Sequence, residues 1–217
     1  MPSVNPATPP RPAPPASPWR SRRKARADRG IKREAVIRAA ARAFERRGFH
    51  NTTLDDIAAA LEVTKPTLYY YVGSKEQLLF ECFVAGLEPI RQALREQRAT
   101  ARPAGERLRA VLLRYAQAVA SEFGWCMVRA EDQDLGDELR LHVKALKREI
   151  DQGLRRLLRE GMADGSIAPC DAKMTSFALA GALNWIAHWY RDSLGLRPGQ
   201  VAEAFVDLFE TGLLPRR

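Results

Sequence analysis

The fold is decided by residues 53–72, which read TLDDIAAALEVTKPTLYYYV. Thr52-Thr53 offers a cap for a short helix, whose acidic first turn suits the positive end of the helix dipole. Glu62 and Val63 then form a tight turn, and Thr64 can cap a second short helix. Two short helices joined by such a turn are typical of a helix-turn-helix, so this stretch predicts a DNA-binding unit.

The second short helix, residues 64–71, carries side chains that suit a major groove. Leu68 can pack inward, whereas three consecutive tyrosines cannot all face one core because neighbouring helical residues diverge by about 100°. Threonine and lysine can contact base edges, and tyrosine hydroxyls contact phosphates and fix the register. Two core helices with an aromatic run are the alternative explanation. The predicted DNA contacts are Thr53, Thr64, Lys65, Thr67, Tyr69, Tyr70, Tyr71 and Lys75.

The flanking segments continue the helical pattern. Apolar side chains recur at helical spacing over residues 36–44, which predicts a supporting helix that ends at Gly48. Ser74 and Gln77 form a capping box for a fourth helix. We expect Pro89 to kink or end that helix, because proline lacks the backbone N–H that a helix interior needs.

The rest of the chain is also expected to be helical. Helices are predicted over about 103–122, 138–162 and 171–190 and from 198 onward, with a short helix and a loop over 123–137. No segment shows the alternation typical of a strand. The sequence therefore predicts an all-α fold of about nine helices. An N-terminal three-helix helix-turn-helix domain precedes a larger C-terminal helical domain.

Composition divides the 217 residues into three segments. Residues 1–28, rich in proline and arginine, are expected to be a disordered arm. Residues 29–90 form the predicted DNA-binding domain, and residues 91–217 the predicted ligand-binding and dimerisation domain. The net charge is +9, and its excess is concentrated in the arm, which suits contact with DNA phosphates. A solubilising tail, or a start codon placed too far upstream, would also explain the arm.

Composition also argues against several classes of protein. No apolar run approaches the roughly 20 residues that span a bilayer, and the N-terminus lacks a signal-peptide core, so we expect a cytoplasmic protein without membrane contact. Three widely spaced cysteines, Cys82, Cys126 and Cys170, argue against a disulfide framework. No pair of cysteines or histidines has zinc-site spacing, so neither a metal nor a cofactor is expected.

A set of short motifs runs through residues 30–90. The motifs are Val36-Ile37, Ala39-Ala40, Ala43-Phe44, Gly48, Thr52-Thr53, Ile57-Ala58, Leu68-Tyr69 and Ser74-Lys75-Glu76. As a set they resemble the TetR family of bacterial transcriptional regulators. Glu62 stands where that family often has glycine, and Tyr71-Val72 replaces its usual His-Phe. These departures keep the fold but make the transfer of any known operator unsafe.

The resemblance implies a homodimer whose last two helices form a four-helix interface. It also implies a ligand cavity in the C-terminal domain, where binding moves the fourth helix and respaces the two recognition helices. Half-sites about 34 Å apart must be met together, so the implied operator is roughly palindromic. The predicted interface residues are Leu179, Leu183, Ile186, Tyr190, Phe205, Leu208 and Phe209.

The ligand cavity is predicted among aromatic and sulfur-containing side chains of the C-terminal domain. Residues 181–191 resemble a subgroup linked to fatty-acid, steroid or aromatic acyl-CoA catabolism, which implies a small apolar or acyl-CoA-type effector. Core packing would explain each candidate as well. The candidates are Phe123, Trp125, Cys126, Met127, Met162, Trp185, His188 and Trp189. The basic residues that could hold a CoA group, or form a solvated helix face, are Lys144, Lys147, Arg148, Arg155 and Arg156.

These observations predict a ligand-responsive regulator of transcription that acts as a repressor. A transcriptional activator, or an architectural DNA-binding protein that uses the basic arm, are the alternatives. An enzyme is not expected, because the sequence has no phosphate-binding glycine loop, HExxH pair or nucleophile elbow. One acidic cluster could bind a cation, although its weakly periodic loop is typical of a solvated surface. It comprises Glu131, Asp132, Asp134 and Asp137.

Overall fold

The structure is a computed structural model, which describes residues 25–191 and 195–212. The predictions for residues 1–24 of the arm therefore lie outside the described residues. Helix α1 (Ala25–Arg47) begins inside the segment predicted to be disordered. The chain divides into two units, one ending at Ala35 and the other beginning at Val36. The first unit holds the opening part of α1, and the second holds the rest of α1 and the other helices.

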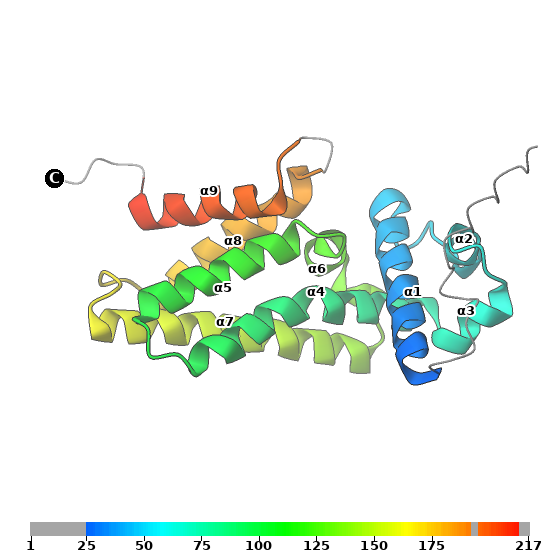
Figure 1. The fold of residues 1–217 in the computed structure, drawn as a ribbon, viewed down its shortest axis with the longest axis horizontal. Coiled ribbons are helices and arrows are strands. Elements are labelled where there is room, and N and C mark those ends of the chain that lie inside the picture. The colour runs from blue at the N-terminus through cyan, green and yellow to red at the C-terminus, as the bar shows by residue number, and fades with distance from the viewer. Residues whose placement is uncertain (1–24, 192–194, 213–217) are drawn as a thin grey trace, which may run out of the picture. The chain divides into compact units, whose positions relative to one another are not determined.

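The described residues form nine α-helices and one 3₁₀ helix without any strand, which confirms the predicted all-α fold (Figure 1). None of these helices is both long enough and apolar enough to cross a bilayer. The elements after α1 are α2 (Leu54–Ala60), α3 (Lys65–Tyr71), α4 (Lys75–Arg98), α5 (Ala104–Val119), α6 (Gly124–Val128), η1 (Asp132–Asp134), α7 (Asp137–Asp164), α8 (Ala172–Trp189) and α9 (Pro198–Thr211).

The first three helices share one apolar core. Phe44 of α1, Ile57 of α2 and Leu68 of α3 are fully buried in it. Helix α1 stops before Gly48, as predicted, and this glycine has a φ of 78°, which glycine adopts with little strain. The Thr52 hydroxyl donates to the Gly48 carbonyl at 2.8 Å and so fixes the loop that leads into α2.

Helix α4 continues through Pro89 to Arg98, so the predicted end of the helix at this proline is wrong. Leu87 and Ile90, on either side of the proline, are buried, and α4 packs against both α5 and α7. Packing of this kind offsets the backbone hydrogen bond that proline removes.

Helix α4 also joins two apolar cores. Its first half, including Leu78 and Phe83, is buried with α1, α2 and α3. Its second half, including Leu87 and Leu94, is buried with α5, α7 and α8. Residue 90, the predicted boundary between domains, thus falls inside one continuous helix.

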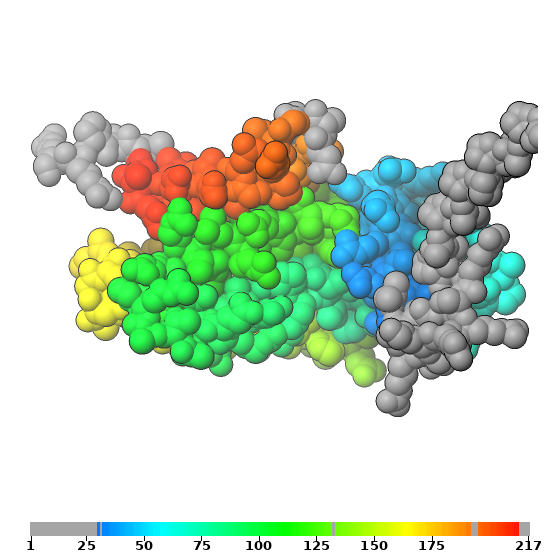
Figure 2. All heavy atoms as spheres, in the orientation of Figure 1, coloured from blue at the N-terminus to red at the C-terminus, as the bar shows by residue number. Residues whose placement is uncertain are grey.

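The remaining helices enclose the larger core. Leu154 and Leu158 of α7 and Leu183 and Ile186 of α8 are almost completely buried there. Helix α9 packs along α5 and covers one side of it (Figure 2). The buried faces of α5, α7 and α8 therefore point toward one another and surround this core.

Candidate nucleic-acid interface and ligand pocket

Thr53 caps α2 through reciprocal hydrogen bonds, as the sequence predicts. The backbone N–H of Asp56 donates to Thr53 Oγ1 at 3.1 Å, and the backbone N–H of Thr53 donates to the Asp56 carboxylate at 2.8 Å. The Thr53 hydroxyl donates to the same carboxylate, and these two bonds to Thr53, side chain first, lower the pKa of Asp56. Thr53 is exposed, at the N-terminus of α2.

The turn between α2 and α3 accommodates a side chain in a left-handed conformation. Glu62 has a φ of 54°, and no other non-glycine residue of the described chain has a positive φ. The N–H of Val63 donates to the Ala58 carbonyl at 3.0 Å, which ties the turn back to α2. The chain thus makes, with a glutamate, the turn for which the family often uses glycine.

Helix α3 buries one face and exposes a polar one. Leu68 is fully buried, while the exposed fractions of Tyr69 and Tyr70 are 46% and 64%. Lys65 Nζ donates to Asp55 of α2 at 2.9 Å, and this bond raises the pKa of Lys65. Of the other predicted contacts, Thr64 is exposed and Thr67 and Tyr71 are half-buried. The hydroxyls of Thr64 and Thr67 are hydrogen-bonded to each other at 2.8 Å.

Four of the predicted DNA contacts lie around one surface hollow of about 290 Å³. Lys75 reaches it from the start of α4, where its Nζ lies 4.3 Å from the centre of the Phe49 ring and donates to the Phe49 carbonyl at 3.0 Å. Two lysines and a helix N-terminus around a hollow suit an anionic group such as a phosphate. The residues that line it are His50, Thr52, Thr53, Leu54, Asp55, Lys65, Tyr69 and Lys75.

A pocket of about 280 Å³ lies between α4, α5, α6, α7 and α8, and we call it the inner pocket. Its walls are mainly apolar, but one side carries hydrogen-bonding groups. The Tyr115 hydroxyl donates to Asn184 at 3.1 Å, and the Ser176 hydroxyl donates to Asp151 at 2.9 Å. Burial raises the pKa of Tyr115 to about 12, so its hydroxyl stays protonated at neutral pH. The lining residues are Leu87, Tyr115, Met127, Val128, Lys147, Ile150, Asp151, Leu154, Ser176, Phe177, Ala180 and Asn184.

The residues predicted for the ligand cavity do not converge on one place. Met127 lines the inner pocket, whereas Trp125 lines a different hollow, beside α1. Trp185 is 61% exposed and stacks on the exposed His188 with ring centres 4.5 Å apart. Trp189 stacks on Phe205 of α9.

The other three candidates make local contacts. Phe123 is half-buried, with the Arg38 guanidinium 6.0 Å from its ring centre. Met162 is half-buried, and its sulfur accepts the backbone N–H of Cys170 at 3.2 Å. Cys126 is fully buried. None of these three lines the inner pocket, and the polar residues Tyr115, Ser176 and Asn184, which do, were not among the sequence candidates. The available signal was a hydrogen-bonding group at each of these positions on an otherwise apolar helix face.

The predicted interface residues divide between core and surface. Leu179, Leu183, Ile186 and Tyr190 are buried among the helices of their own chain. Leu208 is 41% exposed. Phe205 and Phe209 are half-buried against the larger core.

A different row of α8 side chains is exposed instead. Met174 is 60% exposed and Phe177 is 51% exposed, and Gly181 and Trp185 continue the row at helical spacing. We call Met174, Phe177, Gly181 and Trp185 the α8 outer face. Both faces of α8 are apolar, so hydrophobicity alone does not show which face packs inward and which is exposed.

The acidic residues after α6 are held by polar contacts where the structure describes them. Asp134 lies 2.9 Å from His50, Asp137 pairs with Arg140, and Glu131 accepts a hydrogen bond from Gln133. No group of three or more potential metal-ligating side chains occurs within the described ranges.

A helix-turn-helix with an exposed polar second helix, joined by α4 to a helical domain with a mainly apolar pocket, defines a class of DNA-binding regulators. The chain matches "Bacterial regulatory proteins, tetR family" over residues 36–82 and "Tetracyclin repressor-like, C-terminal domain" over residues 101–213. It therefore belongs to the TetR family, as the sequence motifs predicted.

Three relatives show how far the similarity extends. The TetR-family regulator PfmR from Thermus thermophilus is 30% identical, with a TM-score of 0.75 over 83% of this chain and 99% of that one. AibR in complex with isovaleryl coenzyme A and operator DNA is 28% identical, with a TM-score of 0.70 over 82% and 97% of the two chains. The repressor KstR2 of Rhodococcus jostii (strain RHA1) is 25% identical over 84% of this chain and 91% of its own length.

Proposed function

We propose that this chain is a dimeric, ligand-responsive transcriptional repressor that leaves a roughly palindromic operator when its effector binds. The observation that carries the proposal is the exposed polar face of α3 beside the hollow that contains Lys65 and Lys75. The named repressor KstR2 among its relatives favours repression over activation. The proposed activity involves no catalytic step and no cofactor, and it places the protein in the cytoplasm with the operator DNA.

In this proposal, the exposed face of α3 enters the major groove. Lys65, Thr67 and Tyr70 contact base edges, while Tyr69 and Lys75 hold phosphates around the hollow. Thr53 adds a phosphate contact at the start of α2, and Thr64 and Tyr71 flank the groove. Because Asp55 already accepts a hydrogen bond from Lys65, this lysine exchanges one anionic partner for another when DNA binds.

The α8 outer face is the proposed dimer contact, together with the exposed Leu208 of α9. Gly181 and the exposed Ala178 between the larger side chains would let a second α8 approach closely. An apolar row of this kind on the surface marks a protein contact more often than a solvated face. Two copies related by a two-fold axis would present two α3 helices to half-sites about 34 Å apart.

The inner pocket is the proposed effector site. Its volume of about 280 Å³ and apolar walls suit a small apolar group, such as the acyl part of a CoA thioester. Lys147 lines the pocket, and the exposed Lys144 and Arg148 lie on the same helix, where they could hold the anionic part outside. That AibR binds both isovaleryl coenzyme A and operator DNA supports this class of effector.

Helix α4 provides the route from the inner pocket to DNA. Leu87 lines the pocket, and Leu78 and Phe83 of the same helix are packed among α1, α2 and α3. Gly86 brings α6 close to α4, because a Cβ there would lie 2.4 Å from Met127, another wall of the pocket. A ligand that displaces Met127 or Leu87 therefore pushes on the helix that carries the DNA-binding core.

The test is binding of the purified full chain to its own upstream intergenic DNA, with and without a panel of acyl-CoA thioesters. We expect specific binding that one thioester releases. Lys65→Gln should weaken it, whereas Arg159→Gln, which removes one charge from the exposed side of α7, should not. Specific binding that no thioester affects would reject the effector class alone. Binding that prefers the operator no more than random DNA, and is lost on deletion of residues 1–28, would instead support the architectural alternative.

A further inference from the structure

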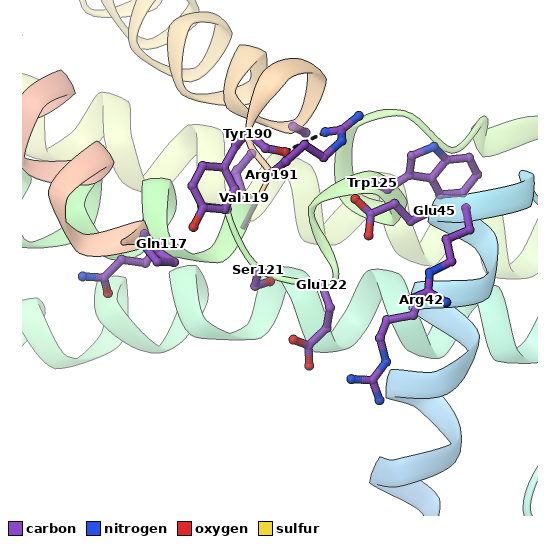
Figure 3. Close-up of a pocket in the computed structure, with 13 residues that line it drawn as sticks. Arg42, Glu45, Gln117, Val119, Ser121, Glu122, Trp125, Tyr190 and Arg191 are labelled. Atoms are coloured by element: carbon purple, nitrogen blue, oxygen red, sulfur yellow. Dashed lines mark hydrogen bonds between the residues drawn. The ribbon is translucent and has the colours of Figure 1, made fainter. Parts of the chain in front are cut away.

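A second hollow, of about 440 Å³, lies where α1, the α5–α6 loop, α6 and the facing ends of α8 and α9 meet. We call it the junction pocket. Figure 3 shows Arg42 and Glu45 projecting from α1 on one side, and Tyr190 and Arg191 at the end of α8 on the other. Its lining residues are Arg42, Glu45, Arg46, Gln117, Val119, Ala120, Ser121, Glu122, Trp125, Ala187, Tyr190, Arg191 and Pro198.

The charges around this pocket leave an excess of arginine. Of its two acidic residues, Glu122 forms an ion pair with Arg38, which does not line the pocket. Arg42 and Arg46 form no hydrogen bond or ion pair through their side chains with any residue that the structure describes. Arg191 donates to the Tyr190 carbonyl at 2.6 Å through one of its several N–H groups. Three guanidinium groups thus line the pocket, and Glu45 supplies its one carboxylate that is not already in an ion pair with a described residue.

The pocket also offers a flat apolar wall. Trp125 is half-buried, and its ring stacks on no other aromatic ring in the described chain. The backbone holds this side chain in place: α6 begins at Gly124, where a Cβ would lie only 1.9 Å from the Val119 carbonyl oxygen, so α6 starts directly against the end of α5. The Tyr190 hydroxyl, by contrast, already donates to the Leu196 carbonyl at 2.9 Å and so serves to shape the wall.

We propose that the junction pocket binds a small organic anion, in which a carboxylate or phosphate is attached to a planar group. Guanidinium groups bind both anions through paired N–H donors, and they do so without any change of their own charge near neutral pH. The planar group would lie against the Trp125 ring. This site is separate from the inner pocket, which takes the effector in the proposed function.

The position of α6 gives such a ligand a regulatory role. Trp125 lines the junction pocket, and Met127, two residues further along the same short helix, lines the inner pocket. Arg42 and Arg46 belong to α1, which is packed into the DNA-binding core. An anion in the junction pocket therefore touches both the DNA-binding core and the shared wall of the effector site, so the two ligands influence each other's affinity reciprocally.

The test is isothermal titration of the full chain at fixed ionic strength with four probes: phenyl phosphate, benzoate, inorganic phosphate and phenol. We expect saturable binding of phenyl phosphate or benzoate, whichever anionic group the site prefers. Arg42→Gln/Arg46→Gln should weaken it at least about tenfold, because both anion partners are removed. The matched control is Arg98→Gln/Arg159→Gln, which removes two exposed arginines elsewhere and should bind like the parent chain. Trp125→Leu should weaken the aromatic anions more than inorganic phosphate.

Several results would overturn the proposal. They are the absence of saturable binding by either aromatic anion, equal affinity in the parent and the Arg42/Arg46 variant, or binding of phenol as tight as that of the anions. Should the double variant fail to fold, Arg191→Gln tests the same pocket from α8 and must weaken binding. This titration contains no DNA, so a negative result would not contradict the proposed repressor function. Likewise, a failure to bind operator DNA would not contradict anion binding in the junction pocket.

Discussion

Helices α3 and α8 both expose aromatic rings, but the neighbours of those rings differ. On α3, Tyr69 and Tyr70 are about as exposed as Phe177 and Trp185 on α8. The α3 rings carry hydroxyls and lie beside lysine and threonine, whereas the α8 rings carry no hydroxyl and lie in a row with methionine and glycine. Polar neighbours of the α8 rings include His188, which stacks on Trp185, and Arg155, whose guanidinium lies 5.0 Å from the centre of the Phe177 ring. Exposed aromatic area is therefore no guide to the partner by itself. In the proposed function, the hydroxyls, lysine and threonine around the α3 rings are what assign that surface to nucleic acid, and the α8 rings are assigned to a second copy of the chain.

The largest effect is expected from Trp185→Glu on the α8 outer face. A carboxylate at the centre of an apolar contact would have to be buried without a partner, so the dimer should dissociate. Operator affinity should then fall by at least about 100-fold, because the second half-site is no longer bound within the same complex. Sedimentation equilibrium and DNA titration measure the two consequences.

Leu141→Glu is the matched control for this substitution. Leu141 is 65% exposed on α7, away from α8 and α9 in sequence, and it should tolerate the same charge without loss of the dimer. If the Trp185 variant stays dimeric with unchanged operator affinity, the α8 outer face is not the dimer contact. The exposed rings of α8 would then have no assigned partner to set against those of α3.

On α3, Thr67→Ala should reduce discrimination between operator and random DNA by about tenfold, since a lost base contact costs on the order of 1–3 kcal/mol. Affinity for random DNA should change little. Thr100→Ala, a half-buried threonine outside the helix-turn-helix, should change neither quantity. Parallel titrations with operator and random DNA measure both affinities. If the variant loses the same affinity for both DNAs, Thr67 contacts a phosphate and not a base.

Lys75→Gln should weaken binding to every DNA sequence by several-fold and lower the slope of log affinity against log salt by about one. The structure adds a second expectation. Lys75 also contacts the Phe49 ring and carbonyl, so this variant should lose about 0.5–1 kcal/mol of unfolding free energy. A normal salt slope with reduced stability would show that Lys75 acts only within the protein.

Sequence patterns were sufficient at several positions where one local rule decided the structure. The cap at Thr53 and the stop at Gly48 both depend on residues within one helical turn, and both are found. Thr64 is an exception, because it holds the predicted cap position of α3 but its side chain makes no capping hydrogen bond. At Ser74 only half of the expected box forms: its hydroxyl accepts the Gln77 N–H, but the Gln77 side chain donates to Glu81. Pro89 does not end its helix, because contacts from distant parts of the chain support the helix around it, and the kink expected there stays a prediction.

The positions of the ligand-cavity candidates were harder to predict than the fold for the same reason. Aromatic and sulfur-containing residues of the C-terminal domain were correctly recognised as apolar, but their place depends on which face of α8 turns inward. Leu183 and Ile186 point into the core, which leaves Trp185 and His188 outside. That choice is made by packing against α5 and α7, far away in sequence.

Tyr115→Phe tests the polar side of the inner pocket, where the Tyr115 hydroxyl of α5 donates a hydrogen bond to Asn184 of α8. Loss of the hydroxyl leaves Asn184 without its donor and should cost about 1–2 kcal/mol of unfolding free energy at neutral pH. In the parent chain the phenol stays protonated up to a pKa of about 12, above its value in the unfolded chain. Stability is therefore unaffected by this group below about pH 10, and falls as pH rises from there toward 12.

The difference between parent and variant isolates that pH dependence. Across pH 9–11, denaturant unfolding of the parent should show the steeper decline, and Tyr70→Phe, which alters an exposed ring, should behave like the parent. Identical slopes for the Tyr115 variant and the parent would mean that the phenol ionises as readily in the fold as outside it.

The smallest effect is expected in the turn that aims α3. Glu62 has a φ of 54°, a conformation that costs a side chain about 1–2 kcal/mol and glycine almost nothing. Glycine also gives the unfolded chain more freedom, which offsets about 0.5–1 kcal/mol, so Glu62→Gly should gain at most about 1.5 kcal/mol. Glu62→Asn, which keeps a Cβ but tolerates this conformation, should fall between the two in chemical denaturation. A loss of stability in both variants would mean that the Glu62 side chain makes a favourable contact stronger than the strain. In that case the glutamate in this turn would stabilise the fold through a side-chain contact, and backbone strain would not be its main effect.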